Sequence, residues 1–132
     1  MSKAIPPALI EHILPFNWEV CRVWALKAAV DQVPCADFAY LLDLPLWSSV
    51  KGRGVLFDLR PRQVMRHPGS SPYQCQRLND VDLAYPIDVL IYRNRRWILD
   101  GVHRIAKHLI LKHTTLPARF HDAAVIPAIA VD

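Results

Sequence analysis

The sequence is short of cysteine and glycine and has no long hydrophobic run. Its three cysteines are widely spaced and form neither a CxxC pair nor a metal-ligand spacing, which indicates unpaired thiols in a reducing compartment. No apolar stretch approaches the ~20 residues that cross a bilayer, and the first residues lack a basic segment followed by a hydrophobic one. Neither a GxSxG elbow nor a phosphate-binding P-loop occurs. We therefore expect a cytoplasmic protein without membrane contact.

Proline is abundant where glycine is scarce. Eleven prolines divide the chain into short elements, since each one disfavours helix at the residue before it. Hydrophobic residues make up 52% and charged residues 21% of the chain, a balance that excludes wholesale disorder. A length of 132 residues predicts a single domain over residues 1–132.

The charge is mildly positive and carried mainly by arginine. The formal net charge is +4, and 11 of the 16 basic residues are arginine. Forked guanidinium groups suit phosphate or carboxylate partners, but an ordinary charged surface accounts for the same composition. Charge alone leaves both interpretations open.

The sequence pattern of the N-terminal part of the chain, residues 1–50, predicts short helices. Periodic apolar residues and capping signals predict helices over residues 6–15, over 18–30 after Asn17, and over 36–43. Stripes at this spacing usually pack against the protein itself, so we expect packing rather than ligand contact for Trp18, Trp24 and Trp47. We interpret residues 1–50 as a helical N-terminal extension that packs on the rest.

Residues 51–132 read as a small sheet with helices. After a link at 51–54, the patterns predict a strand at 55–57, a helix at 60–66, a loop at 67–73, a hairpin of strands 86–92 and 97–100, a helix at 102–113, and extended segments at 116–122 and 125–131. Ile105, Ala106 and Leu109 form the predicted inner face of the long helix. The predicted class is α/β (α+β), a small mixed sheet flanked by helices.

The turn "DGVHR", residues 100–104, joins the last strand of the hairpin to that helix. A helix N-terminus has unpaired N–H groups and partial positive charge, so His103 and Arg104 are poorly placed there for helix stability. A phosphate bound by these amides and the guanidinium would explain them, and Gly101 would let the backbone approach it. Alternatively, Asp100 caps the helix while Arg104 lies in water or pairs with an acid. The residues alone leave both interpretations open.

The order of elements around this turn resembles a known family. "YPIDVLIYRNRRWILDGVHRIAKHLILKHTTLPARF", residues 85–120, resembles the ParB/sulfiredoxin superfamily, and "GVLFDLRPRQVMRHP" extends the likeness to residues 54–120. The resemblance implies a nucleotide- or phosphate-binding domain whose phosphates lie at Gly101, Val102, His103 and Arg104. It also suggests that Arg62 comes over this site. Arg77 is a further candidate anion contact.

The branches of this superfamily differ in chemistry at the turn. Sulfiredoxins carry a reactive cysteine where this chain has Val102, so reduction of a sulfinic acid is not expected. The chromosome-partitioning members, with Gly-Glu-Arg-Arg, imply CTP binding. Free-serine kinases, with a turn like Asp-Gly-His-x-Arg, imply ATP or ADP with Mg²⁺ and Asp100 as general base or metal contact. The leading hypothesis is a domain that binds a nucleotide or another phosphate-bearing ligand. Whether it also acts on that ligand, as a phosphotransferase or nucleotide hydrolase would, is left open by the sequence.

Two alternatives come from other parts of the chain. Arg93, Arg95 and Arg96 crowd the hairpin beside Tyr92 and Trp97, which indicates a DNA-associated accessory protein. The tryptophan-rich segment 1–50 indicates instead a protein-interaction module that self-associates into a homo-oligomer.

The six histidines do not predict a metal site. Those of the long helix, His103, His108 and His113, recur at every fifth position, so we expect them to point in different directions.

Overall fold

The computed structural model describes residues 5–52 and 56–131 as a mixed α+β fold, which confirms the predicted class. The strands are β1 (Asn17–Trp18), β2 (Val30–Pro34), β3 (Ile87–Tyr92), β4 (Arg95–Asp100), β5 (Thr115–Asp122) and β6 (Ala130–Val131). The α-helices are α1 (Val20–Trp24), α2 (Pro61–Arg66), α3 (Pro72–Asp80), α4 (Val102–Ile110) and α5 (Ile126–Ile129). The 3₁₀ helices are η1 (Pro7–His12), η2 (Cys35–Asp43), η3 (Pro68–Ser70) and η4 (Ala123–Val125).

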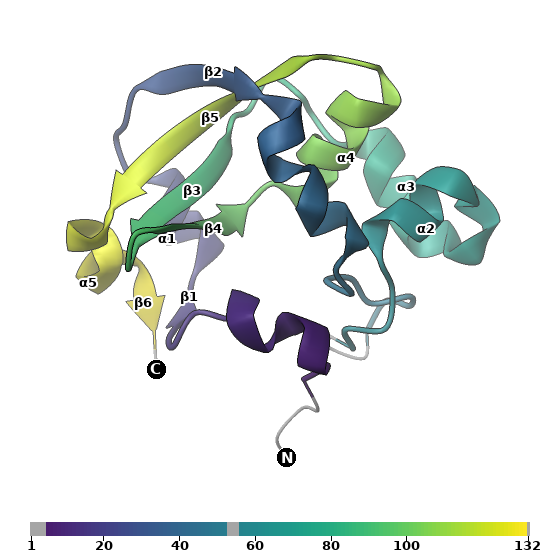
Figure 1. The fold of residues 1–132 in the computed structure, drawn as a ribbon, viewed down its shortest axis with the longest axis horizontal. Coiled ribbons are helices and arrows are strands. Elements are labelled where there is room, and N and C mark those ends of the chain that lie inside the picture. Colours follow the sequence, from purple (N-terminus) through teal and green to yellow (C-terminus); the bar gives the residue numbers. More distant parts are fainter. Residues whose placement is uncertain (1–4, 53–55, 132) are drawn as a thin grey trace.

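The main sheet has four strands in the order β2-β5-β3-β4. The predicted hairpin is confirmed: β3 and β4 pair antiparallel through a tight turn in which Arg93 and Asn94 both have positive φ, as a hairpin of this kind requires. From β4 the chain crosses through α4 and returns as β5, which runs parallel to β3. Figure 1 shows this sheet on the left of the molecule, with α2, α3 and α4 to its right.

The helix predicted over residues 18–30 is wrong beyond Trp24. Asn17 and Trp18 form β1, only Val20–Trp24 is helical, and Val30–Pro34 forms the edge strand β2, which pairs antiparallel with β5. Valines suit a strand, and an edge tolerates Pro34 because its missing N–H faces outward. The N-terminal segment is therefore part of the main sheet and is not a purely helical layer.

Three further predictions of secondary structure differ from the structure. The loop expected at 67–73 contains η3, and α3 begins at Pro72 because Ser71 caps it through a hydrogen bond from the Gln74 N–H, 3.2 Å long. The extended segment expected at 125–131 contains α5, with Pro127 in its first turn, and only Ala130–Val131 is extended. Val55 of the strand predicted at 55–57 lies outside the described residues, and Leu56 and Phe57 are not in a strand.

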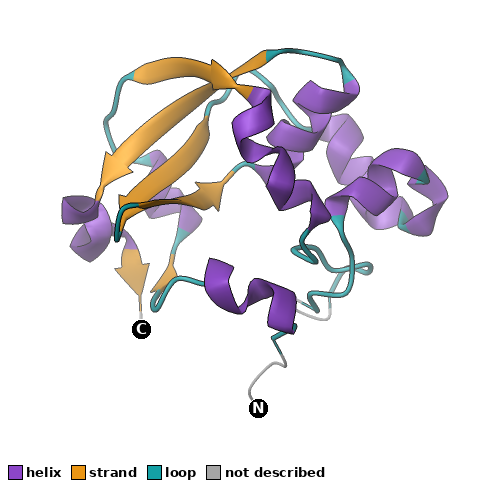
Figure 2. Ribbon diagram, in the orientation of Figure 1, coloured by secondary structure: helices purple, strands orange, loops and turns teal. Residues whose placement is uncertain are grey.

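The core lies on both faces of the sheet. Ile87 and Val89 of β3 face Ile105 and Ala106 of α4, together with residues of η2, α2 and α3. Leu90 faces the opposite layer, where α1 and α5 pack with Trp97 and Leu99 of β4. Figure 2 shows the helices on the two sides of the strands. No helix in the described part of the chain is long and apolar enough to cross a membrane.

Candidate functional site

The turn between β4 and α4 contains a glycine that cannot be replaced and helix amides without an acceptor. Gly101 has φ +120°, and a Cβ atom there would lie 2.6 Å from Ile87 Cγ2, so only glycine fits. The Ile105 N–H is bonded to the Gly101 carbonyl at 3.0 Å. Among the described residues, no acceptor takes the N–H groups of Val102, His103 or Arg104. Three amides therefore remain open at the N-terminus of α4.

Asp100 organises this turn without capping the helix. Its Oδ2 accepts hydrogen bonds from Trp24 Nε1 at 2.8 Å and from Arg104 Nη1 at 3.2 Å. Arg104 Nη1 also donates to the Pro86 carbonyl at 3.2 Å, and the Arg104 side chain is only 15% exposed. The alternative interpretation predicts that Asp100 caps the helix and that Arg104 lies in water or pairs with an acid. The ion pair between Arg104 and Asp100 is present, and the Asp100 cap is absent.

The His103 side chain is held as a neutral ring. It stacks on Trp47 with ring centroids 4.2 Å apart, and its Nε2 lies 2.7 Å from Gln74 Oε1. Gln74 Nε2 donates to the Ser48 carbonyl, which fixes the amide so that His103 Nε2 is the donor. Burial, followed by the charges of Arg77 and Arg104, lowers the pKa of His103 to about 3. The ring therefore supplies no positive charge to a ligand.

A cavity of about 330 Å³ opens at this turn. Two arginines line it, Arg104 from α4 and Arg77 from the exposed face of α3. No carboxylate in the described ranges forms an ion pair with Arg77, whose guanidinium carbon lies 5.7 Å from the Tyr73 ring centre. The remaining lining residues are Trp24, Asp80, Val81, Asp100, Gly101 and His103. The cavity thus combines two guanidinium groups, open amides and two carboxylates.

Two residues predicted for the site contact other parts of the molecule. Arg62 is paired with Asp43 of η2, 2.6 Å from Nε to Oδ1, and it does not line the cavity. The hydrogen bond from Arg62 lowers the pKa of Asp43. The Val102 side chain packs with the apolar core, and Val102 does not line this cavity.

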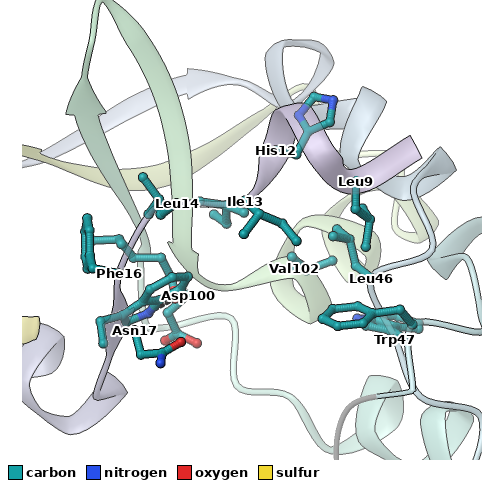
Figure 3. Close-up of a pocket in the computed structure, with 14 residues that line it drawn as sticks. Leu9, His12, Ile13, Leu14, Phe16, Asn17, Leu46, Trp47, Asp100 and Val102 are labelled. Atoms are coloured by element: carbon teal, nitrogen blue, oxygen red, sulfur yellow. Dashed lines mark hydrogen bonds between the residues drawn. The ribbon is translucent and has the colours of Figure 1, made fainter. Parts of the chain in front are cut away.

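An apolar cavity of about 450 Å³ lies on the other side of Asp100 and Val102. Figure 3 shows Leu9 and His12 of η1 across from Val102 and Trp47, with Asp100 at the far end of the cavity. Aliphatic and aromatic side chains dominate its lining, and no arginine or lysine of the described residues contributes to it. Its walls therefore do not suit a phosphate, and Asp100 forms the partition between this apolar space and the polar turn.

The arginine hairpin is largely engaged with its own aromatic residues. The guanidinium carbon of Arg93 lies 4.9 Å from the Tyr92 ring centre, and that of Arg95 lies 4.5 Å from the Trp97 ring. Arg96 pairs with Asp37 at 3.3 Å. These rings are partly covered by arginine, so the hairpin presents charge to a partner more readily than stacking faces.

The helix histidines differ from their predicted arrangement. His108 Nδ1 and His113 Nδ1 lie 2.8 Å apart, because α4 ends at Ile110 and Lys112 adopts a positive φ that turns the chain back. Burial, followed by the nearby His113, lowers the pKa of His108. Within the ranges that the structure describes, no group of three or more His, Cys, Asp or Glu side chains could hold a metal ion.

Sequence reasoning missed one residue of the site, Trp24, and one buried carboxylate elsewhere, Asp88. The sequence predicts packing for Trp24, yet its side chain is 57% exposed and lines the cavity. Asp88 is 2% exposed and binds Arg119 and His121. A signal for Asp88 existed, since a carboxylate inside an apolar strand needs buried partners.

Comparison of the chain with protein-family models, with characterised proteins and with solved structures finds no match.

Proposed function

We propose that the cavity at the N-terminus of α4 binds the phosphates of a nucleotide together with Mg²⁺. The observation that carries this proposal is the convergence of Arg77, Arg104 and the unpaired amides of His103 and Arg104 on one cavity. Oriented N–H groups and guanidinium forks are the donors that phosphate oxygens accept most readily. The resemblance of residues 54–120 to the ParB/sulfiredoxin superfamily supports the same ligand.

The carboxylates give Mg²⁺ a place beside the phosphates. Mg²⁺ commonly binds through one or two carboxylates plus substrate phosphates and keeps several waters. Asp80 and Asp100 both line the cavity, and Asp100 Oδ1 accepts no hydrogen bond from the described residues. Without a cation these carboxylates would repel a phosphate, so we expect nucleotide binding to require Mg²⁺.

Phosphoryl transfer or nucleotide hydrolysis is the reaction class that this arrangement favours. His103 is a poor base because the pKa of its ring is about 3. Asp80 and Asp100 are the candidates for metal contact, and Asp100 is the candidate general base through Oδ1, the oxygen that Trp24 and Arg104 leave open. Release of inorganic phosphate from ATP or CTP, abolished in Asp100→Asn, is the expected sign of turnover.

Calorimetric titration with ATP, ADP and CTP, with and without Mg²⁺, tests the proposed binding. We expect heat of binding only with Mg²⁺, and Arg77→Ala should weaken the affinity about tenfold or more through loss of charge-assisted hydrogen bonds. Arg77 is exposed, so its removal should not disturb the fold. Arg66→Ala is the matched control, since Arg66 is also exposed but does not line the cavity. Absence of binding to all three nucleotides would reject the proposal.

DNA binding by the hairpin is the second candidate function. Arg93 and Arg95 are exposed, and neither pairs with a carboxylate of the described residues. If they bind phosphates of DNA, the affinity should fall steeply with salt and disappear when Arg93, Arg95 and Arg96 are neutralised together. Affinity independent of salt would exclude this function.

The interaction-module interpretation receives less support, because Trp47 is buried and Trp18 half-buried, which leaves only Trp24 of the N-terminal tryptophans prominent at the surface. A cytoplasmic location remains our proposal, and it is consistent with the three free cysteines.

A further inference from the structure

A second cavity, of about 600 Å³, adjoins the proposed phosphate site. The two cavities share Trp24 and Arg104 as lining residues, so they lie side by side. The volume lies within the range of small-molecule sites. Unlike the phosphate cavity, this one is lined mainly by apolar atoms, with Ala28, Tyr85 and Pro86 among its walls.

Two aromatic side chains stand at this cavity with unusually large exposure. Trp24 is 57% exposed and Tyr85 is 61% exposed, although burial of such rings would normally stabilise the fold. Trp24 is nevertheless fixed, because its Nε1 donates to Asp100 Oδ2 at 2.8 Å. Tyr85 lies near Arg104, whose guanidinium carbon is 5.9 Å from the ring centre. Exposed but oriented rings are suited to stacking on a flat ligand.

The acidic group of this cavity is the buried carboxylate of Asp88. Asp88 is 2% exposed, and its Oδ1 accepts from Arg119 Nε and from His121 Nε2, each at 2.8 Å. No hydrogen bond from the described residues reaches its Oδ2. Arg119 also donates to the carbonyls of Leu26 and Val23, so each of its three guanidinium nitrogens is hydrogen-bonded. Asp88 Oδ2 is therefore an acceptor at this cavity that no hydrogen bond from the described residues uses.

We propose that this second cavity holds the base of the nucleotide whose phosphates bind at α4, and that it selects a base with an amino group. The inference rests on the proposed function. The base would stack on Trp24 or Tyr85 and donate an amino N–H to Asp88 Oδ2. Adenine, cytosine and guanine carry such a group. Uracil has no amino group, and its one N–H lies between two carbonyl oxygens that a carboxylate would repel.

The walls of this cavity come from two distant parts of the sequence. Trp24, Ala28 and Val30 belong to the N-terminal segment, whereas Tyr85, Asp88, Arg104 and Arg119 come from residues 85–119. Base selection therefore depends on the packing of the N-terminal segment, up to the end of β2, onto the sheet. This segment lies outside the region that resembles the ParB/sulfiredoxin superfamily.

Dissociation constants for ATP, CTP, UTP and inorganic tripolyphosphate, all with Mg²⁺, test the inference. In the wild type we expect ATP or CTP to bind at least tenfold more tightly than UTP and tripolyphosphate. Tyr85→Ala removes a stacking ring, and Ala28→Phe fills the cavity. Both variants should weaken binding of the preferred nucleotide at least tenfold and leave tripolyphosphate binding unchanged. Ala29→Phe is the matched control, because Ala29 is exposed and does not line the cavity.

The outcomes separate the two proposals. If tripolyphosphate binds as tightly as every nucleotide, the phosphate site stands and the base site is wrong. If UTP binds as tightly as ATP and CTP, the contact with Asp88 is wrong. If neither tripolyphosphate nor any nucleotide binds, the proposed function fails and this inference fails with it. Thermal melting of Tyr85→Ala and Ala28→Phe verifies that each variant is folded.

Discussion

At the scale of single residues, Gly101 decides whether the site can form. Its φ of +120° is a backbone conformation that residues other than glycine rarely adopt. Ile87 also fills the space where a Cβ atom would lie. The tight packing brings the start of α4 against β3 and leaves the first amides of the helix uncovered. This requirement was visible in the sequence as a glycine between an aspartate and a helix. The identity of the residue packed against it was not.

The substitution Gly101→Ala should therefore be strongly destabilising. Strain at positive φ together with displacement of Ile87 should lower the free energy of unfolding by about 3 kcal/mol. Gly69→Ala is the control, because a Cβ atom there meets nothing within 4 Å. Urea denaturation of both variants measures the difference. Equal stability of the two would contradict the geometry described for the turn.

Asp100 provides a second prediction at this scale. Asp100→Ala removes the partner of the largely buried Arg104 and the acceptor of Trp24, which should cost about 2 kcal/mol of stability. Asp43→Ala breaks a more exposed pair with Arg62, where the carboxylate side is 58% exposed, and should cost less than about 1 kcal/mol. Chemical denaturation of the two variants side by side provides the comparison. A larger loss in Asp43→Ala would contradict the organising role of Asp100.

At the scale of elements, α3 and α4 are joined by the contact between Gln74 and His103. The neutral ring of His103 connects the start of α4 to α3 and, through its stack, to Trp47. The sequence indicated the helix with His103 in its first turn. It did not indicate α3, since proline, glycine and serine before Pro72 read as a loop, although Ser71 and Pro72 are also signals for the start of a helix.

The burial of His103 makes the stability of the fold depend on pH. The pKa of His103 is about 3 in the folded protein against an ordinary value of 6.5, so below pH 6.5 the unfolded chain binds more protons. The stabilisation is complete above pH 6.5 and falls by about 1.4 kcal/mol per pH unit as the pH decreases toward 3. Burial lowers the pKa of His108 as well, so its contribution has the same sign.

Comparison of the wild type with His103→Phe between pH 7 and 5 isolates the effect. Phenylalanine keeps a ring on Trp47 but has no proton to bind, so the free energy of unfolding of the variant should depend less on pH. His67→Asn, at an exposed position, should keep the dependence of the wild type. The result that contradicts the assignment is a His103→Phe variant with an unchanged pH dependence.

The elements that could be predicted are those whose signals are local. The β3–β4 hairpin and α4 follow from alternation, a tight turn and an apolar stripe, and Ile105 and Ala106 are fully buried as expected. β2 could not be predicted in this way. Val30–Pro34 becomes a strand because β5 pairs with it, and β5 lies near the opposite end of the chain. Long-range pairing overrode a helical pattern.

At the scale of the whole molecule, the N-terminal segment is part of one fold with the rest. β2 is the edge of the main sheet, and Phe38, Leu41 and Leu42 of η2 belong to the same core as α4 and β5. Arg119 of β5 donates to two carbonyls in residues 23–26. The proposed boundary between an extension over 1–50 and a core over 51–132 therefore divides a continuous core.

A fragment of residues 51–132 should consequently not fold by itself. It would lose β2 and the four fully or nearly fully buried side chains of η2. Removal of a large core side chain typically costs about 2–5 kcal/mol, against a total stability of about 5–15 kcal/mol. Circular dichroism and thermal melting of the fragment beside the full chain provide the measurement. A cooperative melting transition in the fragment would show that the residues resembling the superfamily fold alone.

The candidate site was only partly predictable because it is assembled from distant segments. Asp100, Gly101 and Arg104 are close in sequence and could be identified from one turn. Trp24 comes from α1 and Arg77 from α3, and their position at the same cavity depends on the tertiary fold. Arg62 was expected there from the resemblance, yet Asp43 holds it elsewhere.

The strand order has a consequence for synthesis of the protein in the cell. β5 lies between β2 and β3, so during translation β2 has no neighbour until residues 115–122 have left the ribosome. Until then the emerging chain carries an unpaired strand and an open apolar surface, the kind of surface that chaperones recognise. The second cavity needs Trp24 as well as Arg119, so it is incomplete until β5 has been made.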